Sequence, residues 1–295
     1  MSASDVAAGA RSWLFAPGDS DHKMGKALGS AADIVIVDLE DAVAETEKPV
    51  ARERVAEFLM ANANQRSRLW VRINPVQSKH ALHDLAKIVP AAPGGLMLPK
   101  PRGRADVELL DHYLSALEAT AAIAIGSTQL IIVATETPQA MFTTGSYEGV
   151  PRLVAMTWGA EDIATAIGAI SNRLDDGSYD FTYKLARSLC LTGAAVAGVP
   201  AIETVHADFR DEVGLRALAA EVRRAGFRGM LAIHPAQVDP INEAFTPSEA
   251  EVANASEIVG LFAANPGLGA IGYKGEMLDL PHLTRARAVL ARMKT

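Results

Sequence analysis

The sequence predicts a closed (β/α)₈ barrel of the TIM type, followed by a C-terminal extension. Eight short apolar runs of strand length alternate with longer segments in which apolar residues recur at helical spacing. The length of 295 residues accommodates a barrel of roughly 250 residues and an appendage. Eight alternations favour a closed barrel. An open doubly wound sheet stays the alternative, because strand counts from one sequence are error-prone.

The predicted strands are short and almost entirely apolar, as expected for parallel strands that are buried on both faces. They are Trp13–Ala16, Ile34–Val37, Leu69–Ile73, Gly95–Leu98, Leu130–Ala134, Leu153–Thr157, Val199–Ile202 and Met230–Ile233. The predicted helices between them are Asp21–Ala31, Lys48–Ala61, Ala81–Val89, Asp106–Ile125, Thr182–Ala197 and Asp211–Ala225.

The alternation stops after Phe245. We therefore expect a barrel over residues 1–245 and a C-terminal lid segment over residues 246–295. This segment is predicted to hold two helices, Ser248–Ala264 and Pro281–Met293, joined by a turn with short extended pieces.

The C-terminal segment also contains a glycine pattern. Gly267, Gly269 and Gly272 spell G-x-G-x-x-G, but no predicted strand precedes them and no helix follows directly. The pattern is therefore not expected to bind a dinucleotide.

Composition and charge exclude several classes of function. Lys plus Arg number 28 and Asp plus Glu 35, so the net charge is −7, which argues against a nucleic-acid-binding or anionic-membrane-binding surface. Cys190 is the only cysteine, which rules out an intrachain disulfide and a Cys-type zinc site and indicates a reducing, cytoplasmic setting. No signal peptide or membrane span is indicated.

Charged residues follow most of the predicted strands, and in a TIM barrel these positions share the catalytic rim. Six of the eight strand ends carry an acid or a fixed cation. A barrel that served only as a scaffold would not favour so many charged residues at its strand ends. They are Asp38, Glu40 and Asp41 after the second strand, Arg72 in the third, Lys100 after the fourth, Glu136 after the fifth, Asp162 after the sixth and Glu203 after the seventh.

Glu136 and Asp162 follow neighbouring strands, so they are expected to meet at this rim. Two carboxylates there would make a hard-oxygen site of the kind that Mg²⁺ takes, with water and substrate completing the shell. The alternative is structural: Glu136 would cap the turn before Pro138, and Asp162 would cap the helix that starts at Ile163.

A metal held by two carboxylates can chelate a 2-hydroxy or 2-oxo acid, and a forked, always charged Arg72 can hold an enolate oxyanion. Together they suit the making or breaking of a carbon–carbon bond beside a carbonyl. The alternative for Arg72 is an ion pair with Asp38 or Asp41 that holds the barrel mouth. His234, which precedes a proline, is more typical of a structural donor than of a base.

Lys23 and Lys26 lie on one face of the helix after the first strand, where they could hold a phosphorylated group. A solvated helix face is the alternative for this pair.

At these residues the chain resembles the HpcH/HpaI aldolase and citrate lyase beta subunit superfamily, specifically its coenzyme A ester lyase branch. The matching stretches cover nearly the whole chain in family order. They are RSWLFAPG at Arg11–Gly18, DIVIVDLEDAV at Asp33–Val43, VRINP at Val71–Pro75, LPK at Leu98–Lys100, ETP at Glu136–Pro138, GAEDIA at Gly159–Ala164, IHPAQV at Ile233–Val238 and FTPSEAEV at Phe245–Val252.

The resemblance implies a TIM barrel in which Glu136 and Asp162 hold Mg²⁺ and Arg72 contacts the substrate. It places the nucleotide of the thioester over basic residues near the first helix, with Lys23 and Lys26 as candidates and Arg11 as a weaker one.

The resemblance also implies trimers, or hexamers built of two trimers, whose C-terminal segment covers a neighbour's active site. Within this segment Asp279 of the GxMxD pattern would act as an acid/base. The candidate catalytic residues are therefore Arg72, Asp38 and Asp279.

The sequence departs from the family pattern at two places that affect which acyl group fits the site. Thr135 stands before the ETP motif where an aliphatic residue is usual, and Ile202–His206 replaces an IDGVY-like segment. The expected activity is a Mg²⁺-dependent lyase that cleaves a 3-hydroxyacyl-CoA, such as malyl-CoA or citramalyl-CoA, to acetyl-CoA and a 2-oxo acid. The alternatives are a metal-aided acyl-CoA thioesterase and a citrate lyase beta subunit that works only with an acyl-carrier partner.

Overall fold

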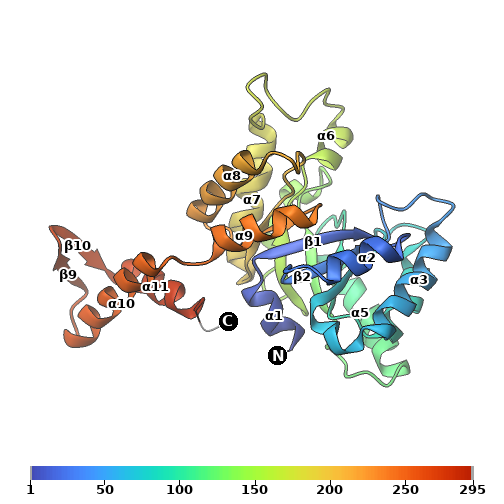
Figure 1. The fold of residues 1–295 in the computed structure, drawn as a ribbon, viewed down its shortest axis with the longest axis horizontal. Coiled ribbons are helices and arrows are strands. Elements are labelled where there is room, and N and C mark those ends of the chain that lie inside the picture. The colour runs from blue at the N-terminus through green and yellow to red at the C-terminus, as the bar shows by residue number, and fades with distance from the viewer. Residues whose placement is uncertain (1, 294–295) are drawn as a thin grey trace. The chain divides into compact units, whose positions relative to one another are not determined.

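The structure is a computed structural model that describes residues 2–293 (Figure 1). Eight parallel strands close into a barrel in sequence order, and β1 pairs with both β2 and β8. The strands are β1 (Ser12–Pro17), β2 (Ile34–Asp38), β3 (Leu69–Arg72), β4 (Gly95–Leu98), β5 (Gln129–Val133), β6 (Leu153–Thr157), β7 (Ala201–Glu203) and β8 (Gly229–Ala232). The predicted (β/α)₈ barrel is confirmed.

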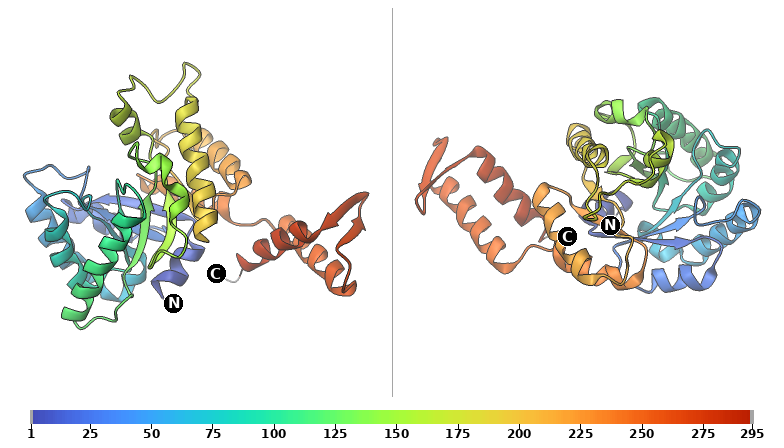
Figure 2. Two further views of the ribbon diagram at one scale, coloured as in Figure 1. Left: turned by 180° about the vertical axis from the view of Figure 1, so that it is seen from behind. Right: turned by 90° about the horizontal axis from the view of Figure 1, so that it is seen from above.

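Helices surround the strands on the outside of the barrel, except for the N-terminal helix, whose Ala7 packs into the buried cluster of the interior (Figure 2). These helices are α1 (Ala3–Gly9), α2 (Asp21–Leu28), α3 (Lys48–Ala61), α4 (Ala81–Ile88), α5 (Arg104–Thr120), α6 (Glu161–Ile167), α7 (Phe181–Ala197), α8 (Glu212–Ala225) and α9 (Val238–Phe245). Short 3₁₀ turns are η1 (Ala63–Arg68), η2 (Val89–Ala91), η3 (Ala140–Phe142), η4 (Thr144–Ser146) and η5 (Pro235–Gln237).

Local sequence signals account for the ends of several helices. The side chains of Ser20, Asp180 and Asp211 accept backbone N–H bonds at the starts of α2, α7 and α8, where the first turn has no partners of its own. α7 ends at Gly198, whose φ of 72° is left-handed and therefore suits glycine.

The barrel interior is a packed apolar core. Trp13 and Trp70 meet edge to face with ring centroids 5.3 Å apart, and both are fully buried. A Cβ atom at Gly95 would lie 2.4 Å from the Trp70 ring, so only glycine fits on β4 at this level. Ala7 and Ala10, at the N-terminal helix, belong to the same buried cluster. The core fixes the strands and thereby the positions of the side chains at their ends.

The chain divides into two compact units, Met1–Asn242 and Glu243–Thr295. The predicted boundary after residue 245 falls at the end of α9. The second unit contains α10 (Glu249–Ala264), the antiparallel hairpin of β9 (Ala270–Tyr273) and β10 (Glu276–Asp279), and α11 (Leu280–Ala291). Its own core consists of Ala255, Ile258, Phe262, Leu278, Leu283 and Ala286.

The glycine pattern of the second unit lies at a hairpin. Gly272 pairs with Met277 across β9 and β10, so the strand–turn–helix context of a dinucleotide fingerprint is not present at these residues. Among the helices over residues 2–293, none has the length and apolar character needed to cross a membrane.

Candidate active site

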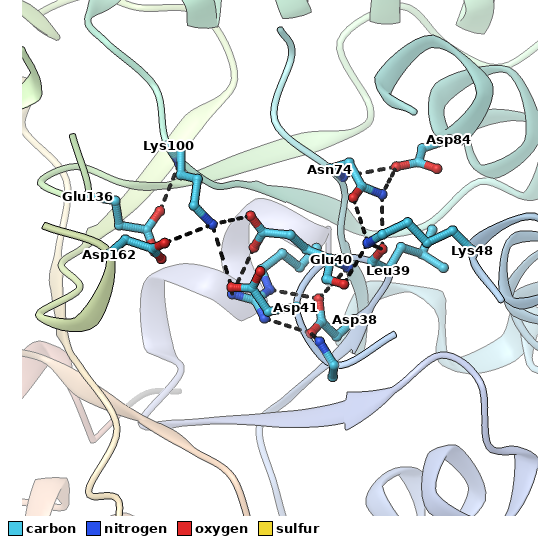
Figure 3. A network of polar contacts seen from close by, with 12 residues as sticks. Asp38, Leu39, Glu40, Asp41, Lys48, Asn74, Asp84, Lys100, Glu136 and Asp162 are labelled. Carbon is cyan, nitrogen blue, oxygen red and sulfur yellow. Dashed lines mark hydrogen bonds and ion pairs between the residues drawn. The ribbon is translucent and has the colours of Figure 1, made fainter. Parts of the chain in front are cut away.

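Asp38 belongs to a polar cluster at the rim of the barrel (Figure 3), and Arg72 is its ion-pair partner. β2 and β3 pair in parallel with Asp38 opposite Arg72, so the two side chains leave the same end of the sheet. Arg72 Nε donates to Asp38 Oδ1 at 2.7 Å, and Nη2 donates to Oδ2 at 2.6 Å. The same carboxylate accepts the backbone N–H groups of Glu40 and Ala42 at 2.9 and 3.0 Å. Asp38 is thus held by four hydrogen bonds.

The charge of Asp38 is secured by these contacts. Burial alone would raise the pKa of Asp38, but the Arg72 guanidinium and the two backbone N–H groups outweigh it, and the pKa lies below its usual value. The ion pair between Arg72 and Asp38, which is the structural alternative for Arg72, is therefore present. It uses two of the five guanidinium N–H donors, and Nη1 lies 3.0 Å from Glu40 Oε2, so one N–H on Nη2 and one on Nη1 are left for a ligand. A direct catalytic role for Asp38 stays a prediction, and its contacts favour the positioning of Arg72.

Lys100 connects this pair to the carboxylates of the next strands. Its Nζ lies 2.5 Å from Glu40 Oε1, 3.3 Å from Asp162 Oδ1 and 3.5 Å from Asp41 Oδ2. Its backbone N–H donates to Glu136 Oε2 at 2.8 Å. Its φ of 52° is left-handed, a conformation that a non-glycine residue adopts at a cost. Both the backbone and the side chain of Lys100 are therefore committed to the carboxylate cluster.

Glu136 and Asp162 lie side by side next to Lys100 (Figure 3). Glu136 follows β5 and is 6% exposed. Burial raises the pKa of Glu136 to about 8, with further increases from the charges of Glu40 and Asp162, while Lys100 acts in the opposite direction. Asp162 lies in the first turn of α6 without capping it, because that helix has no side-chain cap. The capping alternative thus fails for Asp162.

The donor set around Glu136 fits a hard divalent cation. Burial is the main cause of the raised pKa of Glu136, and the charges of Glu40 and Asp162 add to it, so a cation between Glu136 and Asp162 would stabilise the ionised form. Over residues 2–293, no group of three or more His, Cys, Asp or Glu side chains is arranged to hold a metal. Mg²⁺ sites commonly use only one or two carboxylates, with water and substrate oxygens completing the shell.

The loop that carries Glu40 is anchored from beneath by a buried lysine. Lys48 Nζ donates to the carbonyl oxygens of Leu39 and Glu40 at 2.9 and 2.7 Å and to Asn74 Oδ1 at 2.8 Å. Asn74 in turn donates to Asp84 Oδ2 at 2.7 Å. Sequence reasoning missed Lys48, which sits at the start of α3 where a lysine is ordinarily solvated. Its burial is a tertiary effect without a local signal.

Glu203 and the two rim histidines have structural partners. Glu203 is buried and accepts hydrogen bonds from Trp158 Nε1 at 2.8 Å and from Arg187 Nε at 2.9 Å. Burial nonetheless raises the pKa of Glu203. His234 Nδ1 accepts the N–H of Ala236 at 3.2 Å, as expected of a structural residue before a proline. His206 Nε2 lies 3.4 Å from Asp211 Oδ2.

The three cations proposed for the nucleotide lie at different ends of the barrel. Lys23 and Lys26 are exposed on α2, which directly follows β1. Arg11 precedes β1 and holds Asp33 through Nε and Nη2, both at 2.9 Å. A residue before a barrel strand lies at the end opposite the catalytic rim. Nucleotide binding by Arg11 stays a prediction, and its position does not favour it.

Asp279 lies in the second unit at the start of α11. Its Oδ1 is 2.5 Å from His282 Nδ1, and its backbone nitrogen lies 3.2 Å from the same ring nitrogen. The hydrogen bond from His282 holds the pKa of Asp279 below its usual value. Its carboxylate is partly exposed, with 43% of the side chain accessible, so it is open to a ligand.

The sequence matches the model of the HpcH/HpaI aldolase/citrate lyase family over residues 11–235, a range that includes every strand of the barrel. The chain belongs to this family. The family resemblance expected from the motifs is confirmed.

Curated relatives of the family align along almost the entire chain. A citrate lyase subunit beta-like protein of Mycobacterium tuberculosis is 34% identical, with 95% of this chain and 94% of the relative covered. A (3S)-malyl-CoA thioesterase of Cereibacter sphaeroides is 33% identical, with 96% and 94% covered. A mitochondrial citramalyl-CoA lyase of Mus musculus is 32% identical, with 95% and 85% covered. Named relatives thus include both lyases and thioesterases.

A solved structure also superimposes on nearly the whole chain. Protein CitE of Mycobacterium tuberculosis, in complex with magnesium, acetoacetate and coenzyme A, matches with a TM-score of 0.81 and 31% identity, covering 98% of this chain and 100% of that one. That relative therefore binds magnesium and coenzyme A together.

Proposed function

We propose that this protein is a Mg²⁺-dependent coenzyme A ester lyase. It would cleave a 3-hydroxyacyl-CoA that carries a carboxylate on the hydroxyl-bearing carbon, giving acetyl-CoA and a 2-oxo acid. One observation carries the proposal: Glu136 and Asp162 converge beside Lys100, next to an arginine that Asp38 aligns. The magnesium and coenzyme A of the solved relative, and the citramalyl-CoA lyase among the curated ones, support it.

Glu136 and Asp162 would hold the Mg²⁺. When bound, the ion would neutralise the substrate carboxylate and make the neighbouring hydroxyl more acidic. Asp279, whose lowered pKa keeps it ionised, would accept the hydroxyl proton, which allows the adjacent carbon–carbon bond to break with its electron pair passing to the thioester as an enolate. The hydroxyl-bearing carbon becomes the carbonyl of the 2-oxo acid.

Arg72 would stabilise the enolate that forms. Its orientation is fixed in advance by Asp38, so little ordering is needed when negative charge develops on the thioester oxygen. Asp279 would then deliver a proton to the enolate carbon and complete acetyl-CoA. Lys23 and Lys26 would attract the phosphates of coenzyme A, and a trimer or hexamer would bring Asp279 to a neighbouring site.

A thioesterase is the second candidate, because a malyl-CoA thioesterase is 33% identical to this chain. It would use the same acids with water and release free coenzyme A and a hydroxy acid. Incubation of the purified protein with malyl-CoA, citramalyl-CoA and citryl-CoA, with and without chelator, separates the two. We expect acetyl-CoA and glyoxylate, pyruvate or oxaloacetate. Release of free coenzyme A together with an intact hydroxy acid would identify the protein as a thioesterase and not a lyase.

A third reading is a citrate lyase beta subunit that acts only on an acyl-carrier protein, and a beta-like relative is 34% identical. Turnover of free coenzyme A thioesters by the isolated protein would exclude that reading. No turnover of any free thioester, with turnover restored on a carrier-bound acyl group, would establish it.

A further inference from the structure

We propose that Lys100 is the internal counter-cation of the carboxylate cluster, and that a divalent ion must displace its ammonium group from Asp162 to bind. Lys100 would thus be a positioning residue that sets the affinity and exchange of the metal. The inference rests on the metal role given above to Glu136 and Asp162, and it adds a residue that those two acids alone do not imply.

The balance of charge around Lys100 supports this role. Five carboxylates belong to the cluster, and the cations paired with them at the rim are Arg72 and Lys100. The carboxylates are Asp38, Glu40, Asp41, Glu136 and Asp162. Arg72 is committed to Asp38 and Glu40, at 2.6 and 3.0 Å. Asp162 therefore depends on Lys100 for its counter-charge until another cation arrives.

The geometry separates two functions of Lys100. Its backbone N–H holds Glu136 Oε2 at 2.8 Å and would do so with any side chain at this position. Its Nζ holds Asp162 Oδ1 at 3.3 Å, a longer contact than the 2.5 Å to Glu40 Oε1. Asp162 is held more weakly than Glu40 and is the acid that a cation could take over, while Glu40 keeps the ammonium close.

The backbone at Lys100 has a left-handed φ of 52°, a conformation that Ala92, Ala122, Arg152 and Lys274 also adopt. The conformation aims the N–H and the side chain at two different acids.

Substitution by methionine separates the ammonium from the backbone contact. Lys100→Met keeps the N–H that holds Glu136 and removes the competing charge. A unit charge a few Å from a divalent ion in a wet site alters its binding substantially, so Mg²⁺ affinity should rise about tenfold at low salt, and less as salt screens the charge. Lys100→Arg, which keeps the charge, should change affinity less than threefold. A matched surface control is Lys87→Met, which removes a lysine paired with Glu53.

Isothermal titration calorimetry with Mg²⁺ near pH 8 measures these affinities, and thermal unfolding with and without Mg²⁺ gives an independent readout. We expect Lys100→Met to be less stable than the wild type without metal, and to gain more in melting temperature when Mg²⁺ is added. Unchanged or weaker Mg²⁺ binding by a folded Lys100→Met protein would overturn the proposal, since that is what a purely structural lysine predicts.

Two further variants keep the test decisive. If Lys100→Met does not fold, Lys100→Gly removes the ammonium and relieves the backbone strain, and the same increase in affinity is expected of it. Glu136→Ala and Asp162→Ala report on the metal site itself. If both bind Mg²⁺ like the wild type, the proposed function fails. If both lose binding while neither Lys100→Met nor Lys100→Gly gains affinity, only the role of Lys100 fails.

Discussion

Gly159→Ala is a single-methyl perturbation of the proposed metal site. A Cβ atom at Gly159 would lie 3.0 Å from Glu136 Cγ and 3.1 Å from Oε1. Gly159 is not among the residues with positive φ, so alanine is acceptable to the backbone and the conflict is with the Glu136 side chain alone. Glu136 cannot yield freely, because it is 6% exposed and Lys100 holds its other oxygen.

The size of the effect follows from these distances. Ordinary contacts between carbon atoms are about 3.5–4.0 Å, so the carboxylate must move by roughly 0.5 Å. Displacement of a side chain that orients or supplies a metal ligand typically costs about 10–100-fold in affinity, or about 1.4–2.8 kcal/mol. The overpacking itself should lower the free energy of unfolding by about 1–3 kcal/mol.

Calorimetric titration with Mg²⁺ and thermal unfolding measure both quantities. Gly145→Ala is the matched control, because no atom lies within 4 Å of a Cβ at Gly145 and its φ is not positive. The control should bind Mg²⁺ like the wild type. Wild-type affinity in a folded Gly159→Ala protein would refute the reasoning, because Glu136 would then not need its observed position to bind the metal.

Four further outcomes are expected. Arg72→Lys should lower kcat by at least about 100-fold with little change in KM, because an ammonium cannot keep the two-point contact with Asp38 and still face an oxyanion. An unchanged kcat in steady-state kinetics would show that Arg72 does not stabilise the enolate. Metal affinity should rise by up to about tenfold per pH unit and level off above about pH 8, because the proton on Glu136 competes with the ion below its pKa of about 8. A metal affinity that stays constant from pH 6 to 9 would contradict this. The native metal-free protein also holds that proton more tightly than the unfolded chain, so its stability should fall as pH rises from about 4.5 to 8. Asp279→Asn should lose about 100-fold or more in kcat and in solvent-deuterium exchange into acetyl-CoA while binding Mg²⁺ normally, and unaltered exchange would exclude Asp279 as the proton donor.

The barrel could be predicted because its strands are buried on both faces and leave a direct mark in the sequence. The run Leu153–Thr157 was expected as a strand and is β6 with the same bounds. The predicted strand Val199–Ile202 begins two residues too early, since β7 runs from Ala201 to Glu203. Apolar residues at the end of a loop resemble the strand they enter, so such boundaries are the least certain.

The site was predictable only in part, because its organisation depends on tertiary contacts. Glu136 and Asp162 could be brought together from strand order alone. The burial of Lys48 beneath the Glu40 loop could not, since it depends on Asn74, 26 positions away. Arg11 illustrates a different limit, because its position before β1 already assigns it to the opposite end of the barrel.

The most direct measurement of the central claim is the Mn²⁺ stoichiometry and affinity of the wild type, Glu136→Gln, Asp162→Asn and the double variant, followed by electron paramagnetic resonance. We expect one tightly bound ion per chain in the wild type. Each single variant should bind Mn²⁺ about 100-fold or more weakly, and the double variant should show no binding. Wild-type affinity in either folded single variant would show that these two acids do not share a metal.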